Sequence, residues 1–332
     1  MPATKPAVWF LAIQAGTGAD VFTERLSTAL NSIGIQSGVT WLPHRAEYLP
    51  WLTPPPQPPP WANIVHINTW LHRRFIPAQL PVVATMHHVV HDPHFAPFKH
   101  ISQSLYHRFW IKKIEKQALA RADRISSVSQ YTTNQLSNCF GKTETTVIHN
   151  GVDLSLFRPT SSREPSSTFR LVYVGSWSRR KGSDLLPTIM ERLGTGFELR
   201  YTGPPRPMPA NCVALGRLDT TTLVELYNNS DALLFPSRLE GFGQVAAEAM
   251  ACGLPVVAGR NSALPEVIMH QRTGLLVEHD SPQGYVDAIQ TLSSSRSRWL
   301  EMSLAARKHA KANFDIKRSA DAYAEIYYRL VE

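Results

Sequence analysis

Residues 236–255 read PSRLEGFGQVAAEAMACGLP and follow a short apolar run from Leu233 to Phe235. The run predicts a buried strand, Pro236 ends it, and two glycines precede a helical stretch that starts at about Gln244. A strand, a glycine turn and a helix N-terminus bring free backbone N–H groups and the positive end of the helix dipole to one place. The first turn of this helix is therefore a candidate phosphate site.

Two carboxylates frame the same turn. Glu240 comes directly before it, and Glu248 follows Gln244 by four positions, on the same helix face. An acid beside a phosphate site repels the phosphate, so both side chains suit sugar hydroxyls or a developing cation better. Taken singly, the turn also fits an ordinary α/β connection, and Glu248 also fits a solvated helix residue.

The spacing Glu-x7-Glu, followed by AMACGLPVVA at residues 249–258, resembles the signature of the family 4 retaining glycosyltransferases. The resemblance covers most of the chain and is tightest over residues 230–277. It implies an α/β protein of GT-B fold, in which two Rossmann-like domains face each other across a cleft. It assigns Glu240 to the donor sugar and Glu248 to the ribose. The other residues that it places at the donor here are Gly241, Phe242, Gly243, Gln244 and Val245.

Composition limits the class of protein. The chain has 332 residues, 43% of them hydrophobic, which is enough for two globular domains. Its net charge of +8 favours acidic partners such as nucleic acid, an anionic membrane or phosphorylated substrates. Three scattered cysteines, the lack of an 18-residue apolar run and an N-terminus without a secretion pattern favour a cytoplasmic protein.

The N-terminal half alternates strands and helices. Ala7–Ile13 predicts a buried strand that runs into Gly16-Thr17-Gly18, and residues 21–30 show helical spacing. Residues 64–68 and 82–85 predict two further strands, which indicates an α/β domain. The resemblance implies that Gly16 and Gly18 approach the donor phosphates from this domain.

Four histidines follow the strand at residues 82–85. They are His87, His88, His91 and His94. Three interpretations remain open: a metal site, a sugar-binding or catalytic histidine beyond a strand end, and simple loop histidines. Adjacent His87 and His88 can hardly share the fixed geometry that a metal site needs. The resemblance aligns His87 with the histidine that reaches the donor sugar, with His88 as its rival.

Residues 107–124 predict a helix with six Lys or Arg and two acids, a local charge of +4. Phe109, Trp110, Ile111, Ile114 and Ala118 form an apolar stripe that we expect to pack on the core. The opposite basic face is either simply solvated or contacts anionic lipid headgroups. Nucleic acid is not expected as a partner, since no known binding module accompanies the charge.

The polar run at residues 160–168 predicts an interdomain linker. We therefore expect two domains, at 1–160 and 168–317. The resemblance implies that the first binds the acceptor and the second the nucleotide-sugar. The resemblance implies that a last helix, at about 318–332, packs back on the first domain.

A second candidate phosphate site opens the second domain. The strand 169–174 is followed by Arg179, Arg180, Lys181 and Gly182 before a helix. A solvated charged turn is the alternative. The resemblance assigns Lys181 to the donor diphosphate. Its usual second cation is replaced by Ser176, so Arg179 or Arg180 is the expected substitute. It also assigns the nucleobase to the backbone of Gly216, Arg217 and Leu218.

The expected function is metal-independent transfer of a sugar from a UDP or GDP sugar, with retention of configuration and no further cofactor. The expected acceptor is a glycan or a lipid-linked intermediate of cell-surface polysaccharide synthesis, which favours a peripheral place at the inner face of the membrane. Catalytic roles fall to Glu240, His87 and Lys181. Two alternatives remain: a nucleotide-sugar epimerase of the same fold, and a non-catalytic protein that binds a membrane or a partner.

Overall fold

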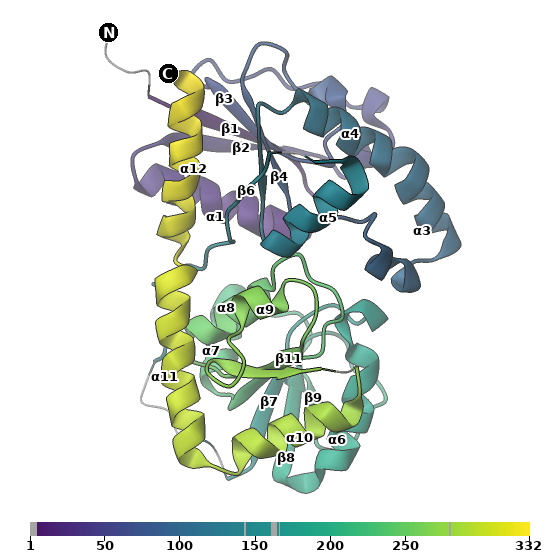
Figure 1. Cartoon of the computed structure of the whole chain (residues 1–332), viewed down its shortest axis with the longest axis vertical. Helices are drawn as coiled ribbons and strands as arrows, with labels where there is room; N and C mark the ends of the chain where they lie inside the picture. The colour runs from purple at the N-terminus through teal and green to yellow at the C-terminus, as the bar shows by residue number, and fades with distance from the viewer. Residues whose placement is uncertain (1–4, 143, 161–164, 166, 279) are drawn as a thin grey trace. The chain divides into compact units, whose positions relative to one another are not determined.

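The computed structural model describes residues 5–142, 144–160, 165, 167–278 and 280–332, which form two compact units (Figure 1). Unit 1 contains the described residues up to Gly151 and those from Ile316 onward, and unit 2 contains those between Val152 and Asp315. Residues 152–160, assigned from the sequence to the first domain, pack with unit 2. Two observations account for this: the Val152 N–H donates to the Phe314 carbonyl of unit 2 (2.7 Å), and Phe157 is fully buried. Residues 161–164 and 166 of the predicted linker lie outside the described residues.

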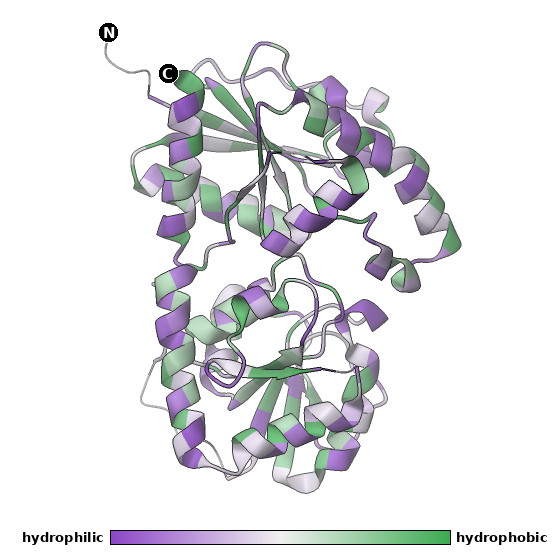
Figure 2. Ribbon diagram, in the orientation of Figure 1, coloured by the Kyte–Doolittle hydropathy of each residue, from purple (hydrophilic) through white to green (hydrophobic). Residues whose placement is uncertain are grey.

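Unit 1 is built on a parallel sheet whose described strands run in the order β2-β1-β3-β4-β5-β6. Every residue of β1 is buried, as expected for a strand covered on both faces. Figure 2 shows hydrophobic segments along the strands and mixed colours along the helices. The strands are β1 (Ala7–Ile13), β2 (Gln36–Leu42), β3 (Ile64–Asn68), β4 (Val82–Met86), β5 (Arg124–Ser127) and β6 (Thr146–Val147).

Helices connect these strands, and a last one comes from the C-terminal end of the chain. They are α1 (Gly18–Ser32), α2 (Arg45–Tyr48), α3 (Ile101–Tyr106), a π-helical turn (His107–Ile111), α4 (Lys112–Arg121), α5 (Gln130–Phe140) and α12 (Ile316–Val331), with 3-10 turns at Pro50–Leu52, Arg73–Phe75 and Pro93–Phe98. The helix predicted for residues 107–124 was wrong at its end, because Ala122 is extended and Arg124 opens β5. The π-helical turn also changes the helix phase, and Phe109, expected in the packed stripe, is 67% exposed.

The C-terminal helix α12 packs inside unit 1, beside α1. Tyr327 and Tyr323 are fully buried, and the Tyr327 hydroxyl lies 2.5 Å from His66 Nδ1 on β3. The Tyr323 hydroxyl lies 3.1 Å from those of Thr85 and Ser126, on β4 and β5. Burial lowers the pKa of His66 from 6.5 to about 3, so this ring is neutral and the network fixes α12 to the sheet without a charge.

Unit 2 is built on a second parallel sheet, with described strands in the order β12-β11-β10-β7-β8-β9. The strands are β7 (Phe169–Tyr173), β8 (Phe197–Tyr201), β9 (Cys212–Ala214), β10 (Ala232–Phe235), β11 (Val256–Gly259) and β12 (Gly274–Val277). The helices are α6 (Leu186–Leu193), α7 (Thr220–Asn228), α8 (Gln244–Ala251), α9 (Leu264–Val267), α10 (Pro282–Ser293) and α11 (Arg296–Asn313), with 3-10 turns at Arg179–Lys181, Ser183–Leu185 and Gly194–Gly196.

The strand order of unit 2 locates its ligand site. β7 pairs with β8 on one side and with β10 on the other, so the chain reverses its direction of growth between β7 and β10. Open α/β sheets bind ligands beyond the carboxyl ends of the strands at such a switch point. In unit 1 the same reversal falls between β1 and β3.

Candidate functional site

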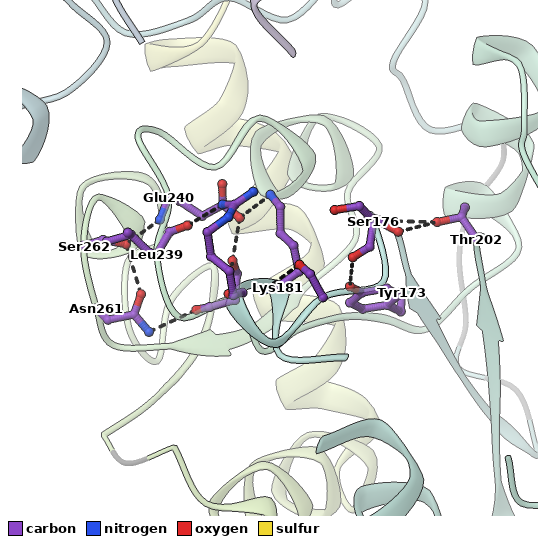
Figure 3. A network of polar contacts seen from close by, with 12 residues as sticks. Tyr173, Ser176, Lys181, Thr202, Leu239, Glu240, Asn261 and Ser262 are labelled. Atoms are coloured by element: carbon purple, nitrogen blue, oxygen red, sulfur yellow. Dashed lines mark hydrogen bonds and ion pairs between the residues drawn. The ribbon is translucent and has the colours of Figure 1, made fainter. Parts of the chain in front are cut away.

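The two candidate phosphate turns of unit 2 meet at its switch point. The basic turn Arg179–Lys181 follows β7, and the loop at residues 236–243 follows the adjacent β10. Figure 3 shows Lys181 and Glu240 directed toward each other from these two segments. Lys181 Nζ lies 2.6 Å from Glu240 Oε1, and both side chains are mostly buried, at 17% and 11% exposed. Two residues assigned separate tasks from the sequence therefore form one ion pair.

Glu240 is held at several points. Its Oε1 also accepts a hydrogen bond from Ser237 Oγ (2.6 Å), and its backbone N–H donates to Ser262 Oγ (2.9 Å). Burial raises the pKa of Glu240, but the charges of Lys181 and Arg180 and the hydrogen bonds outweigh it, so the net pKa is below its usual value. The carboxylate is therefore ionised at neutral pH.

Gly182 brings the basic turn close to the second loop. It has φ +69°, and a Cβ atom there would lie 1.9 Å from the Pro236 carbonyl oxygen. Both the backbone conformation and the space exclude a side chain. The glycine after Lys181 is therefore what lets the lysine stand beside Glu240.

The two arginines proposed as a second cation differ in their surroundings. Arg180 Nη1 donates to the Leu239 carbonyl (2.8 Å), which ties its side chain to the loop before Glu240. Arg179 is exposed. Ser176, which replaces the family's arginine, is exposed too, and its carbonyl accepts a hydrogen bond from the Tyr173 hydroxyl (3.0 Å).

The helix after the glycine turn is α8. Its N-cap is Gly243, with φ +106°, and a Cβ there would approach Leu264 Cδ2 to 2.8 Å. Gln244 Nε2 donates to Glu248 Oε1 (3.2 Å), so these two residues share a helix face as predicted. Glu248 is 5% exposed and is not the solvated helix residue of the alternative interpretation. Of the remaining predicted donor residues here, Phe242 is buried against Phe314, while Gly241 and Val245 are partly exposed.

The predicted nucleobase segment lies at another strand end. Gly216 has φ +72° and pairs with Gly203 through both backbone groups, at 2.8 and 3.1 Å. These groups are already in use within unit 2. Arg217 is exposed and Leu218 is partly exposed, so in this segment these two residues are more accessible to a nucleobase than the paired backbone of Gly216.

The glycine loop of unit 1 already holds an anion of its own chain. Asp20, in the first turn of α1, accepts hydrogen bonds through Oδ2 from the N–H groups of Ala15 (2.9 Å) and Gly16 (2.7 Å). Gly18 begins α1, and a Cβ there would meet nothing within 4 Å. The loop has the predicted anion-binding geometry, with a carboxylate in the place where a phosphate was expected.

His87 lines a small cavity at the carboxyl ends of β1, β3 and β4. Its ring meets Phe22 of α1 edge to face at 4.7 Å, and burial lowers its pKa to about 4 although the Asp20 charge opposes the shift. Asn68, the last residue of β3, lines the same cavity. Its buried Oδ1 accepts no hydrogen bond from any residue that the structure describes. Sequence reasoning missed Asn68, although a polar residue ending a buried parallel strand was a usable signal.

The other three histidines of this loop contact different residues. Among the described residues, no group of three or more His, Cys, Asp or Glu side chains could hold a metal ion. His88 lies against Phe95, His91 Nε2 lies 2.8 Å from Glu115 Oε2, and His94 contacts Asp92.

Comparisons with known proteins agree with this architecture. The family model "Glycosyl transferases group 1" matches residues 168–295, and the model "Glycosyltransferase Family 4" matches residues 18–156. Sucrose-phosphate synthase from Thermosynechococcus elongatus superposes with a TM-score of 0.80 at 19% identity, covering 98% of this chain and 99% of that one. Anabaena Alr3699/HepE in complex with UDP and glucose superposes with a TM-score of 0.74 at 19% identity, covering 97% and 99%. The two units thus define a GT-B glycosyltransferase fold.

Curated relatives point the same way. A D-inositol 3-phosphate glycosyltransferase of Mycobacteroides abscessus is 32% identical over 65% of this chain and 54% of its own length, and a glycogen synthase of Mycobacterium tuberculosis is 26% identical over 80% and 68%. The chain therefore spans little more than half of the first of these. With both of its units matched, the chain belongs to the family 4 glycosyltransferases, the glycosyl transferases group 1.

Proposed function

We propose that the chain transfers a sugar from a nucleoside-diphosphate sugar to an acceptor hydroxyl. The observation that carries this proposal is the buried Lys181–Glu240 pair at the switch point of unit 2. A lysine there can take up the charge of a leaving diphosphate, and an ionised carboxylate beside it can bind hydroxyls of the sugar. The donor is of UDP or GDP type. In support, solved structures of the similar Alr3699/HepE contain UDP and UDP-glucose.

The proposed mechanism needs no metal, because Lys181 and a neighbouring arginine supply the positive charge for the departing β-phosphate. The sugar becomes oxocarbenium-like, with Glu240 at its hydroxyls and Glu248 at the ribose. His87 of unit 1 contacts the sugar as a neutral ring. The acceptor attacks from the leaving-group face, and the departing phosphate oxygen takes its proton, so the anomeric configuration is retained.

The test is product analysis with UDP- and GDP-sugars and a panel of glycan and lipid-linked acceptors. Transfer with a retained anomeric configuration, read from proton NMR couplings, is expected. An inverted product would overturn the mechanism. Conversion of the sugar nucleotide with no acceptor present would favour the epimerase, and an unchanged cellular function in Glu240→Ala would favour the non-catalytic protein.

We further propose that the acceptor is lipid-linked and that residues 107–124 contact an anionic membrane. Within the described chain, no helix is long and apolar enough to cross a bilayer. A peripheral contact has support from the surface of unit 1: Lys113 and Lys116 are exposed on α4, and Ile101, Leu105 and Phe109 are 82%, 51% and 67% exposed on the preceding helical turns. Basic and apolar side chains together suit an interfacial helix. Such a protein would work at the cytoplasmic face.

Vesicle sedimentation tests this contact. Binding to vesicles containing phosphatidylglycerol, but not to phosphatidylcholine alone, is expected. The double variant Lys113→Glu/Lys116→Glu should lose it, while Lys308→Glu/Lys311→Glu, on exposed positions of α11 in unit 2, should keep it. Equal binding by both double variants would contradict the proposal.

A further inference from the structure

Arg238 has an unusual number of contacts for a residue in the active-site loop. It lies two positions before Glu240, and its side chain is 14% exposed. Nη1 and Nη2 bind both oxygens of Asp184, at 2.6 and 2.9 Å, Nε binds Asp280, and Nη1 also donates to the Arg179 carbonyl. Four N–H···O contacts thus use most of the five donors of the guanidinium.

These contacts join three loops that leave the same edge of the sheet. Asp184 follows the basic turn after β7, Arg238 belongs to the loop after β10, and Asp280 follows β12. A bidentate arginine–carboxylate pair fixes both distance and orientation, which a single ion pair does not. Because the guanidinium donates to groups of unit 2, we infer that Arg238 holds segments of this unit together.

Arg238 also holds the backbone directly before Lys181. The side chain of Arg238 holds the Arg179 carbonyl, and its backbone N–H donates to the Arg180 carbonyl at 2.8 Å. The two peptide units before the lysine are therefore attached to the residue that stands two positions before Glu240. We propose that Arg238 is a positioning residue that holds Lys181 opposite Glu240. The effect of this positioning on activity rests on the proposed function, in which Lys181 meets the diphosphate and Glu240 the sugar.

Hydrogen exchange tests the clamp without any ligand. In Arg238→Ala the amides of residues 179–184 and 237–240 should exchange about 10-fold faster or more than in the wild-type chain, because those loops open locally. Asp184→Asn, which leaves the arginine in place, should speed exchange in the same segments. The control is Arg200→Ala, which removes the Arg200–Glu198 pair on β8 and should leave both segments unchanged. Wild-type exchange in Arg238→Ala would overturn the proposal.

A double-mutant cycle tests whether the clamp acts through Lys181. Arg238→Ala should weaken UDP or GDP binding about 10-fold in the wild-type background and hardly at all in Lys181→Ala, because coupled residues are not additive. Arg238→Lys should restore little, since lysine lacks the bidentate fork. Additive losses would show that Arg238 contacts the nucleotide directly and would overturn the positioning role. If the wild-type chain bound no nucleotide, the proposed function would fail, while the exchange experiment would still decide the clamp.

Discussion

The glycine loop of unit 1 and the basic turn of unit 2 follow the same plan and differ in charge. Each comes after a central strand, at the switch point of its sheet, and leads into a helix. In unit 1 the N–H groups of the loop bind the carboxylate of Asp20, which is four residues away from Gly16. In unit 2 the turn carries Lys181, which forms an ion pair with the nearby carboxylate of Glu240.

A strand, a glycine turn and a helix therefore define a place for an anion but not which anion occupies it. Unit 1 supplies its own anion, Asp20, and the neutral rings of His66 and His87 are among the groups that line the adjacent cavity. In unit 2 the ionised side chains of Lys181 and Glu240 lie together and are mostly buried. We therefore propose that unit 2 carries the charge chemistry of the transfer and that unit 1 orients neutral hydroxyls.

The largest effect is expected from Glu240→Gln. The amide keeps the shape of the side chain and removes its charge, so sugar transfer should fall at least about 100-fold. UDP or GDP affinity should stay the same or rise, because Lys181 loses its partner. His87→Gln in unit 1 should slow transfer about 10-fold. Single-turnover rates and calorimetry would measure both. A larger loss in His87→Gln than in Glu240→Gln would reverse our assignment of the two units.

The two glycines give a matched comparison of stability. Gly182→Ala should lower the free energy of unfolding by about 3 kcal/mol, because its Cβ would overlap the Pro236 carbonyl in addition to the left-handed backbone. Gly16→Ala has the same sign of φ and open space, so about 1 kcal/mol is expected. Urea unfolding curves would measure both values. Equal losses would mean that the two turns are packed alike.

Acid should affect unit 1 before unit 2. Burial lowers the pKa of His66 to about 3 and that of His87 to about 4, against 6.5 for the free side chain. Below pH 6.5 these histidines bind protons in the unfolded chain but not in the folded chain. Their contribution to stability is therefore present above pH 6.5 and is lost as the pH falls toward 3 for His66 and toward 4 for His87. At pH 5 the loss from His66 is about 2 kcal/mol. Glu240 has a lowered pKa, and its contribution is lost only below its ordinary value of 4.5.

Hydrogen exchange at pH 7.5 and pH 5, corrected for intrinsic rates, would compare the two units. Protection should fall in β3, β4 and α12 of unit 1 and persist in β7 and β10 of unit 2. Loss of protection in unit 2 first would contradict the assignment of neutral histidines to unit 1.

The smallest effect is expected from Asp20→Asn. The variant removes the charge that the loop of unit 1 now binds, at a cost of about 1 kcal/mol in stability. If the loop approaches the donor phosphates, as the family resemblance implies, nucleotide affinity should rise about 3-fold, since a repelling charge is gone. Asp321→Asn, on α12 of the same unit, is the control for lost charge alone. Weaker nucleotide binding in Asp20→Asn only would show that the carboxylate itself contacts the ligand.

The strands and the helix face of the candidate site were predictable from the sequence, because they depend on short-range patterns. The apolar runs gave the strands around both switch points, and the spacing of Gln244 and Glu248 gave their shared helix face. The capture of the Gly16 N–H by Asp20 is also local, and the acid at the start of α1 was a signal that went unused.

The rest depends on contacts between distant residues. Arg238 meets Asp184 and Asp280 across 54 and 42 positions, and no local pattern marks such a pairing. The exposure of Phe109 follows from a π-helical turn, which residue propensities do not reveal. The partnerless Oδ1 of Asn68 depends on how β3 packs, and only its place at a strand end was visible in advance.

A calorimetric titration with UDP, GDP and ADP tests directly whether Lys181 of unit 2, which stands beside Glu240, receives the diphosphate. The wild-type chain, Lys181→Ala and the exposed control Lys113→Ala would be compared. We expect one nucleotide to bind the wild-type and the control chains equally, and to bind Lys181→Ala at least about 100-fold more weakly, as for a charge-assisted phosphate contact. Equal affinity in Lys181→Ala, or no binding of any of the three by the wild-type chain, would contradict the account.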